Sequence, residues 1–449
     1  MIAMRKIYTL MLFCTVMISA SCSKFLEVKP VGIIIPEKTN DYELLLDDIN
    51  ITRSFYSSTI FTYDDISNVT FSPQTETSID ANLYFWKTYL DVNSQSRPAA
   101  WADYYNNISN LNVILEGVLS AADGTPQKRK QIYAEALVAR TFPYFHLLSL
   151  FAPAYDPLTA TADLGLPFVV STDQNVPLPD RLTLKANYEQ LIADILTAIP
   201  DLPTQNINKS RITKNVAYGM LSRIYMSMRD YPNALKYAEL VIASGNAVLL
   251  NYNDYASSND LPQTNVSPEE LFLRYSTNSR YRFSNELLAK FDPAVDLRMK
   301  LFTATDAGVV SFQNANYNPN RGITYAEIYL NKAECLARSG AVDQAMDVLN
   351  NTIRINRIAA DAYEPLEAAD QEDAVSLILL ERRRELAFKG LRWSDMKRLD
   401  KEKRMQPVVR YAPNGTMVFE TLTPGSLKYT FQIPLQTQLF NPNMKLNPR

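Results

Sequence analysis

The chain has 449 residues, of which 47% are hydrophobic and 21% are charged. This composition is typical of a globular protein with enough apolar material for a large core. The 45 lysines and arginines nearly balance the 48 aspartates and glutamates, for a formal net charge of −3. Because no basic excess exists to neutralise phosphates, we do not expect nucleic acid as a partner.

The N-terminus has the pattern of a bacterial export signal. Arg5 and Lys6 precede an almost uncharged apolar run, residues 7–20, which is shorter than the about 20 residues that a membrane-spanning helix needs. Small residues then lead into Cys22, as in a bacterial lipobox, where the cysteine thiol becomes lipid-modified. We therefore expect residues 1–21 to be a signal peptide and Cys22 to carry the lipid. Ordinary signal cleavage with an incidental cysteine is the alternative.

The remaining cysteines and the single histidine exclude several kinds of site. Cys14 lies inside the signal, so once Cys22 is modified Cys335 has no partner for a disulfide or a cysteine-based zinc site. Cys335 falls in an amphipathic helical pattern, which predicts a small buried thiol. His146 falls in an apolar helical pattern, which indicates a core residue rather than a member of a catalytic triad or a metal site.

Helical periodicity dominates the first half of the chain. Glycine is scarce, at 12 residues, and we predict a mostly α-helical fold with a loop-rich region and few short strands. An apolar stripe predicts a first long helix over residues 101–118. Residues 127–151 predict a second helix, which Pro143 should kink or break. Residues 184–199 predict a third, which Pro200 ends.

Two segments, residues 217–242 and 328–353, follow the same pattern. Each predicts a helix-turn-helix unit whose second helix carries a small alanine, Ala234 or Ala345, near its start. This spacing approximates the tetratricopeptide pattern, in which the small residue lets the two helices pack closely. The two units lie far apart in the sequence, so we expect dispersed hairpins rather than a uniform tandem array.

The second half of the chain alternates between irregular and helical patterns. Residues 246–322 form a loop-rich insert with many Asn, Ser, Pro and Tyr residues, and an insert of this length is more often functional than filler. Helical pattern resumes over 323–400, and 401–449 reads as an irregular tail. No low-complexity linker interrupts the chain, so we expect residues 22–449 to be one domain, with 22–245 as its N-terminal helical part.

Two regions have the residue mixture that carbohydrate recognition requires. Sugar C–H surfaces pack on aromatic faces, and amide, carboxylate or guanidinium groups at the rim bond the hydroxyls. One region is residues 82–97, directly before the first long helix, and the other is the middle insert. The candidate ligand-binding residues are Trp86, Tyr89, Arg97, Tyr281, Asn316 and Tyr317. Core packing or loop anchoring is the alternative for each aromatic, and glycan binding predicts that Trp86 or Tyr281 lies exposed in one cleft.

The segment "ERRRELAFKGLRWSDMKR", residues 381–398, combines arginines, acids and aromatics at helical spacing. Leu386 and Phe388 should face inward, and Gly390 permits a turn before Trp393. The arginines and acids can pair locally. We therefore predict a buried ionic and aromatic contact that holds two helices together, rather than a ligand site.

Several segments, spread over nearly the whole chain, occur in the order known from one protein family. They include "CSKFLEVKP", "WADYYNNISNLNVIL", "AEALVARTFPYFHLLSLFAPAY", "RITKNVAYGMLSRIYM", "YAEIYLNKAECLARSG", "LILLERRRELAFKGLRWSDMKRL" and "FQIPLQTQLFNPNMKLNP". As an ordered set they resemble the SusD/RagB family of outer-membrane nutrient-binding lipoproteins. The resemblance implies a SusD-like α-helical fold.

The same resemblance implies a noncatalytic lipoprotein anchored to the outer membrane and facing the cell exterior. Such a protein binds oligosaccharides or polysaccharides and delivers them to a SusC-like TonB-dependent transporter. No nucleotide fingerprint or acid/base motif appears in the sequence, and we expect no cofactor, no metal and no enzymatic activity. The alternative is a tetratricopeptide-like module that captures a peptide or protein.

Overall fold

The computed structural model describes residues 36–67, 71, 78–173, 175–275, 281–312, 319–412 and 417–449. Within it, residues Lys38–Arg449 cluster as one unit. Helices dominate and the strands are short, which confirms the predicted mostly α-helical fold. None of the helices in these ranges is both long and apolar enough to cross a membrane.

The elements of this unit are as follows. The α-helices are α2 (Thr39–Leu46), α3 (Ile49–Thr52), α4 (Ile79–Tyr84), α5 (Ala99–Gly117), α6 (Pro126–Phe151), α7 (Leu184–Ala198), α8 (Lys214–Met228), α9 (Tyr231–Ile242), α10 (Asn285–Leu288), α11 (Leu297–Phe302), α12 (Tyr325–Arg338), α13 (Val342–Asp347), α14 (Gln371–Glu385), α15 (Arg392–Lys401) and α16 (Leu435–Phe440). The strands are β1 (Leu164–Pro167), β2 (Arg181–Thr183), β3 (Glu270–Phe272), β4 (Tyr281–Arg282), β5 (Thr303–Asp306), β6 (Val309–Phe312), β7 (Ile323–Thr324), β8 (Val408–Tyr411) and β9 (Val418–Leu422). They pair antiparallel as β1–β2, β3–β7, β4–β6–β5 and β8–β9.

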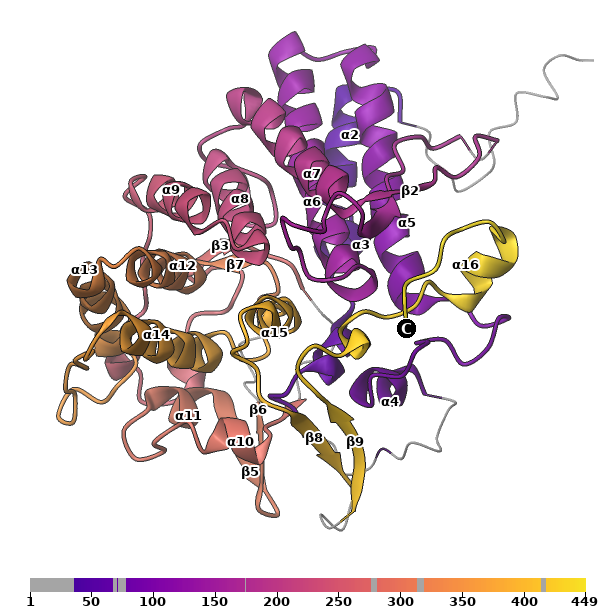
Figure 1. Cartoon of the computed structure of the whole chain (residues 1–449). Helices are drawn as coiled ribbons and strands as arrows, with labels where there is room; N and C mark the ends of the chain where they lie inside the picture. Colours follow the sequence, from indigo (N-terminus) through magenta and orange to yellow (C-terminus); the bar gives the residue numbers. More distant parts are fainter. Residues whose placement is uncertain are drawn as a thin grey trace, which may run out of the picture. The chain divides into compact units, whose positions relative to one another are not determined.

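The three long helices predicted from periodicity are present as α5, α6 and α7. Helices α5 and α6 pack against α2, and α7 packs against α6 (Figure 1). Pro126 occupies the first turn of α6, and the Thr125 hydroxyl accepts a hydrogen bond from the Lys128 amide at 3.1 Å, so the helix start is capped. The predicted break at Pro143 is wrong, because α6 continues to Phe151. Nearly all of the second half of α6 is buried, and this packing offsets the hydrogen bond that proline removes.

Both predicted helical hairpins are confirmed, as α8–α9 and α12–α13. Ala234 and Ala345 are completely buried, as close packing of each pair requires. The Ser222 hydroxyl of α8 donates to the Ala234 carbonyl at 3.0 Å, which ties the first pair together. With α14, the two hairpins form the left half of the view in Figure 1, where α12 lies next to α9 and α14.

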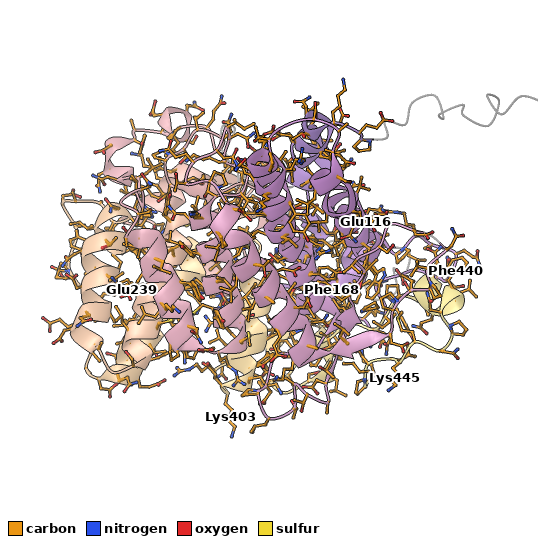
Figure 2. The ribbon with its side chains drawn as sticks, turned by 90° about the horizontal axis from the view of Figure 1, so that it is seen from above. Glu116, Phe168, Glu239, Lys403, Phe440 and Lys445 are labelled. Atoms are coloured by element: carbon orange, nitrogen blue, oxygen red, sulfur yellow. The ribbon has the colours of Figure 1, made fainter. Side chains whose placement is uncertain are left out.

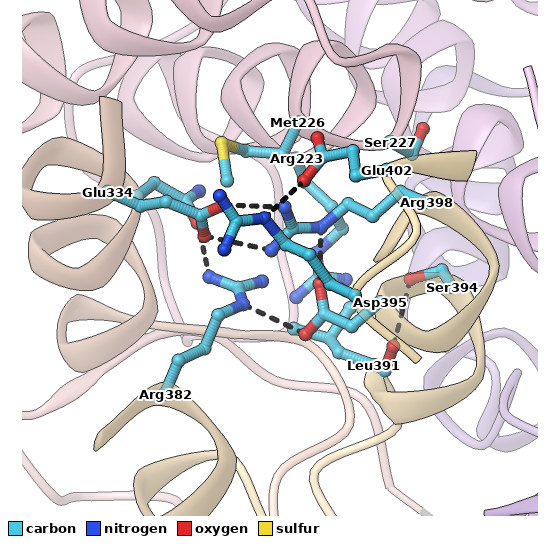
Figure 3. A network of polar contacts seen from close by, with 12 residues as sticks. Arg223, Met226, Ser227, Glu334, Arg382, Leu391, Ser394, Asp395, Arg398 and Glu402 are labelled. Atoms are coloured by element: carbon cyan, nitrogen blue, oxygen red, sulfur yellow. Dashed lines mark hydrogen bonds and ion pairs between the residues drawn. The ribbon is translucent and has the colours of Figure 1, made fainter. Parts of the chain in front are cut away.

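A buried network of arginines and carboxylates joins α12, α14 and α15 (Figure 3). Arg398 of α15 donates to both oxygens of Glu334 of α12, at 2.6 and 2.8 Å. Asp395 accepts from Arg382 of α14 and from Arg398, each at 2.8 Å. All four side chains are at most 8% exposed, and Gly390, at φ +90°, permits the turn between α14 and α15. The predicted ionic contact between helices is therefore confirmed.

A second set of contacts holds α15 against α6 and the C-terminal tail. The Lys397 ammonium group donates to the carbonyls of Ser149, at 2.7 Å, and Ala152, at 2.5 Å. Trp393, which is 1% exposed, stacks near Tyr429 with ring centroids 5.4 Å apart. Burial lowers the pKa of Lys397 to about 7, because removing the charged amine from water costs free energy.

We predict that Glu334→Gln lowers the free energy of unfolding by about 3–5 kcal/mol, because it leaves the buried Arg398 without its main counter-ion. Urea unfolding followed by circular dichroism measures this loss. Glu189→Gln is the matched control, because its pair with Lys185 is exposed and exposed pairs contribute little. Equal unfolding midpoints for Glu334→Gln and wild type would show that the network does not stabilise the fold.

We also predict that Lys397→Met changes the pH dependence of stability. Between the folded pKa of about 7 and the usual value of 10.5, the unfolded chain binds the lysine proton and the native chain does not, so wild-type stability rises with pH. The variant lacks this contribution, which is at most about 1.4 kcal/mol per pH unit. Urea unfolding across this pH window should therefore show that the free energy of unfolding of wild type rises with pH relative to that of the variant. An equal pH dependence for the two proteins would contradict the lowered pKa of Lys397.

Candidate functional site

A surface cleft of about 550 Å³ lies between the N-terminal segment, the start of α10 and strand β8. The N-terminal segment here means the described residues between 61 and 86. Its lining residues are Asp64, Ile66, Ser67, Tyr84, Ser284, Asn285, Glu286 and residues 407–412. Tyr84 comes from the first region predicted to bind glycans, and Ser284, Asn285 and Glu286 come from the middle insert. The structure therefore brings parts of both predicted regions to one cleft.

Backbone hydrogen bonds join the two sides of this cleft. The Ser67 amide donates to the Arg282 carbonyl at 3.1 Å, and the Ser284 amide donates to the Asp65 carbonyl at 2.8 Å. Between them, Ile66 and Phe283 form an antiparallel bridge. In Figure 1, α10 and β6 lie on one side of the β8–β9 hairpin and α4 lies on the other. These bonds form the cleft before any ligand arrives.

Arg410 of β8 forms the base of the cleft and is 3% exposed. Its guanidinium group donates to four backbone carbonyls of the N-terminal segment. The acceptors are Phe61, Tyr63, Ile66 and Tyr84, at 2.7 to 3.2 Å. The same group lies over the rings of Tyr84 and Trp86, with centroid distances of 4.0 and 4.5 Å. Arg410 thus fixes the C-terminal hairpin to the N-terminal segment through hydrogen bonds and cation–π contacts.

Carboxylates beside the cleft are held by two arginines. Arg392 donates to both oxygens of Asp64 at 2.7 Å, and Arg383 bonds Asp65 at 2.7 Å and Glu286 at 2.8 Å. Burial acts to raise the pKa of Asp64, but Arg392 and Arg383 outweigh it and hold that pKa well below its usual range. Glu286 shows the same balance, with its pKa lowered by Arg383 despite partial burial. Both carboxylates are therefore ionised and hydrogen-bond acceptors only.

Tyr411 presents an exposed aromatic surface at this cleft. Its side chain is 49% exposed, whereas Tyr84 is 4% exposed. We did not single out Tyr411 from the sequence. The signal that marks it is the dipeptide "NG" between "VVRY" and "MVFETL", which is typical of a β-hairpin.

Trp86 and Tyr281 do not lie exposed in a cleft, so this expectation from the sequence is wrong. Trp86 is 1% exposed and its indole N–H donates to the Thr62 carbonyl at 2.9 Å. Tyr281 is 2% exposed and stacks on Phe388 with centroids 5.5 Å apart. Trp86 instead lies under the guanidinium group of Arg410, a lining residue of the cleft, and Tyr281 lies on β4, which pairs with β6.

Tyr89 and Arg97 do not line this cleft. Tyr89 is half-buried, and Arg97 is exposed and bonds Asp103 at 2.5 Å. Arg97 lines a separate polar hollow of about 470 Å³. The ligand-binding roles of Tyr89 and Arg97 stay predictions. Cys22, Asn316 and Tyr317 lie outside the described residues, and their roles stay predictions as well.

His146 and Cys335 are core residues, as predicted. His146 is 2% exposed, with the ring of Phe142 centred 4.5 Å away, and burial lowers its pKa well below the usual value. Cys335 is 2% exposed, and burial raises the pKa of its thiol. Throughout the described ranges, no group of His, Cys, Asp and Glu side chains is arranged to hold a metal ion.

Helical hairpins, long bundle helices and a preformed surface cleft together define a SusD-like protein, and comparison with known families agrees. The family described as "Starch-binding associating with outer membrane" matches residues 24–226, and the "SusD family" matches residues 298–448. This chain belongs to the SusD/RagB family, as the order of its sequence segments predicted.

Individual relatives show the same fold. SusD-like protein P2 of Formosa agariphila is 23% identical, over 83% of this chain and 87% of that protein. A SusD superfamily protein from Bacteroides thetaiotaomicron has a TM-score of 0.73 at 22% identity, over 92% of this chain and all of that one. A SusD-like carbohydrate-binding protein from Bacteroides vulgatus has a TM-score of 0.69 at 20% identity, over 91% of this chain and 97% of that one. A laminarin-binding SusD-like protein gives 0.63 at 17% identity, over 92% and 99%.

We predict that Arg410→Lys destabilises the protein by about 2 kcal/mol or more, although it keeps the charge. Lysine has three donors on a point charge and cannot reproduce a planar group that bonds four carbonyls and stacks on two rings. Thermal and urea unfolding measure the loss. Arg53→Lys is the matched control, because Arg53 is exposed. If the two variants unfold alike, Arg410 does not hold the cleft together.

Proposed function

We propose that this protein is a noncatalytic cell-surface lipoprotein that binds oligosaccharides or polysaccharides at the cleft and delivers them to a SusC-like TonB-dependent transporter. The observation that carries the proposal is the exposed face of Tyr411 beside the polar side chains of Ser67, Asn285 and Glu286 in a preformed cleft. The starch-binding description of the matching family and the laminarin-binding relative support carbohydrate as the ligand class.

Each part of the cleft has a role in this proposal. A sugar ring packs its C–H face on Tyr411, as carbohydrates pack on aromatic rings. The Asn285 amide and the Ser67 hydroxyl supply donors and acceptors for sugar hydroxyls, and the Glu286 carboxylate accepts from them. Arg383 holds Glu286 in place at 2.8 Å, so little conformational freedom is lost on binding.

The absence of catalysis is part of the proposal. A glycosidase needs one carboxyl group that keeps its proton near neutral pH beside a second, ionised one. At the cleft, arginines hold the pKa values of Asp64 and Glu286 below their usual ranges, so neither carboxyl retains a proton to donate. Burial raises the pKa of the adjacent Asp65, but this residue is 0% exposed and does not line the cleft, so its carboxyl does not reach a bound sugar. This electrostatic arrangement suits hydrogen-bond acceptance rather than general acid chemistry.

The location rests on the sequence signal and the family. Residues 1–21 resemble an export signal, and lipid on Cys22 would attach the protein to the outer membrane, with each buried CH₂ contributing about 0.8 kcal/mol. The family description associates its members with that membrane. We place the bound glycan and the transporter on the exterior side, where polymeric nutrients arrive.

We predict that Tyr411→Ala weakens glycan binding about 5- to 30-fold, because the aromatic face contributes on the order of 1–2 kcal/mol. Affinity electrophoresis and calorimetry against laminarin, starch and other polysaccharides measure the effect. Phe440→Ala is the matched control, since Phe440 is 74% exposed on α16, at the edge of the view in Figure 2.

Both variants should unfold at the wild-type midpoint, because each side chain is largely outside the core. Wild-type affinity in Tyr411→Ala would sink the assignment of the cleft. Saturable binding of peptides, with no binding of any polysaccharide, would instead favour the peptide-capture alternative.

A further inference from the structure

A second and larger hollow is present in the same unit. This groove has a volume of about 960 Å³ and shares no lining residue with the cleft. Most of its lining comes from three segments: residues 204–215, which end in the first turn of α8, the residues that follow α9, and residues 265–275, which include β3. A hollow of this size accommodates an oligosaccharide.

The charged side chains of the groove are all paired within the protein. The Lys209 ammonium group donates to the carbonyls of Ser267 and Glu270, at 2.5 and 2.9 Å. Arg211 is 1% exposed and donates to the buried Glu135 at 2.7 Å. The carboxylate of Glu270 accepts from Asn320 at 2.6 Å and is also 1% exposed. These hydrogen bonds hold the charged groups against the walls of the groove, and this arrangement favours an uncharged ligand.

Four carboxamide groups line the groove without a role in holding the fold. They belong to Gln205, Asn215, Asn246 and Asn265. Within the described part of the chain, none of these side chains makes a hydrogen bond. A carboxamide carries a donor and an acceptor side by side, which matches two neighbouring hydroxyls of a sugar ring. Three separate wall segments contribute these groups, so they can contact one ligand from several sides.

Apolar surface stands beside these amides. Ile207 and Val266 are 73% and 64% exposed, and Tyr275 is half-buried in the wall. Exposed aliphatic side chains and a tyrosine ring supply surface for the C–H faces of a sugar. The combination of neutral amides with apolar surface is typical of carbohydrate sites.

The walls are fixed by hydrogen bonds. The Leu273 amide donates to the Lys209 carbonyl at 2.8 Å, and Arg274 donates to the Ser210 carbonyl at 2.9 Å. The bond from the Leu273 amide lies just after β3, on the side of this segment that does not pair with β7. An extended peptide that adds a strand needs a free edge, so this wall favours a saccharide over a peptide.

We propose that the groove is a second carbohydrate-binding site, specific for neutral oligosaccharides. The inference rests on the proposed function for its ligand class, but on different residues. One polysaccharide chain that engages both the cleft and the groove is held more tightly than by either site, because the second contact is intramolecular.

The test compares the purified wild type with two variants and a control. Tyr411→Ala alters the cleft, and the double variant Asn246→Ala/Asn265→Ala alters the groove at two exposed side chains. The matched control Gln127→Ala/Asn443→Ala removes two exposed carboxamides outside both sites. Calorimetry with laminarihexaose and with maltoheptaose gives the number of sites and their affinities.

We expect two sites per chain in the wild type and the control, with binding at the groove at least about tenfold weaker in the double variant. Groove binding should change little with salt, because an uncharged sugar forms no ion pair with the protein. Binding that Tyr411→Ala abolishes and the double variant leaves intact would overturn the groove assignment and leave the cleft standing.

Binding that only the double variant weakens would support the groove and remove the cleft. Failure of both probes to bind would overturn both sites. Saturable binding of an uncharged alanine-rich peptide, lost in the double variant, would also overturn the carbohydrate assignment of the groove.

Discussion

The three consecutive arginines of α14 organise much of this structure, because a helix turns about 100° per residue and sends neighbouring side chains in different directions. Arg382 bonds Asp395 of α15, and Arg383 bonds Asp65 of the N-terminal segment. Arg384 donates to the carbonyl of Lys290, directly after α10. A single helix thereby positions α15, the N-terminal segment and the middle insert.

Buried ion pairs of this kind fix geometry more than they add stability. Removing two charges from water costs several kcal/mol, and their attraction offsets that cost only when the partners are in place. Breaking one pair is therefore expensive, as for Glu334 and Arg398. The geometry of the cleft is fixed in the same way, since Arg383 and Arg392 hold the carboxylates beside it. Its preorganisation follows from the same residues that close the core.

Local pattern in the sequence was enough to predict the helices, because apolar periodicity and capping residues act within a few turns. It found α5, α7 and both hairpins, and it anticipated the buried contact of α15. It failed where distant segments decide the outcome. Pro143 stays inside α6 because neighbouring helices cover it. Trp86 is buried because Arg410, more than 300 positions away, covers its ring at 4.5 Å. No local pattern encodes that partner, and Tyr411 became a candidate only once β8 was placed beside Tyr84.

The two hollows differ in charge, and together they restrict the ligand. The cleft exposes the Glu286 carboxylate, whose side chain is 59% accessible and whose pKa is lowered by Arg383. A uronic acid or sulfated sugar would bring a second negative charge against it, which costs free energy. The groove presents amides, and its charged side chains are hydrogen-bonded within the protein, so little there repays an anionic ligand for its lost hydration. Both the cleft and the groove therefore favour uncharged glycans, and one polymer of neutral sugars can bind to both.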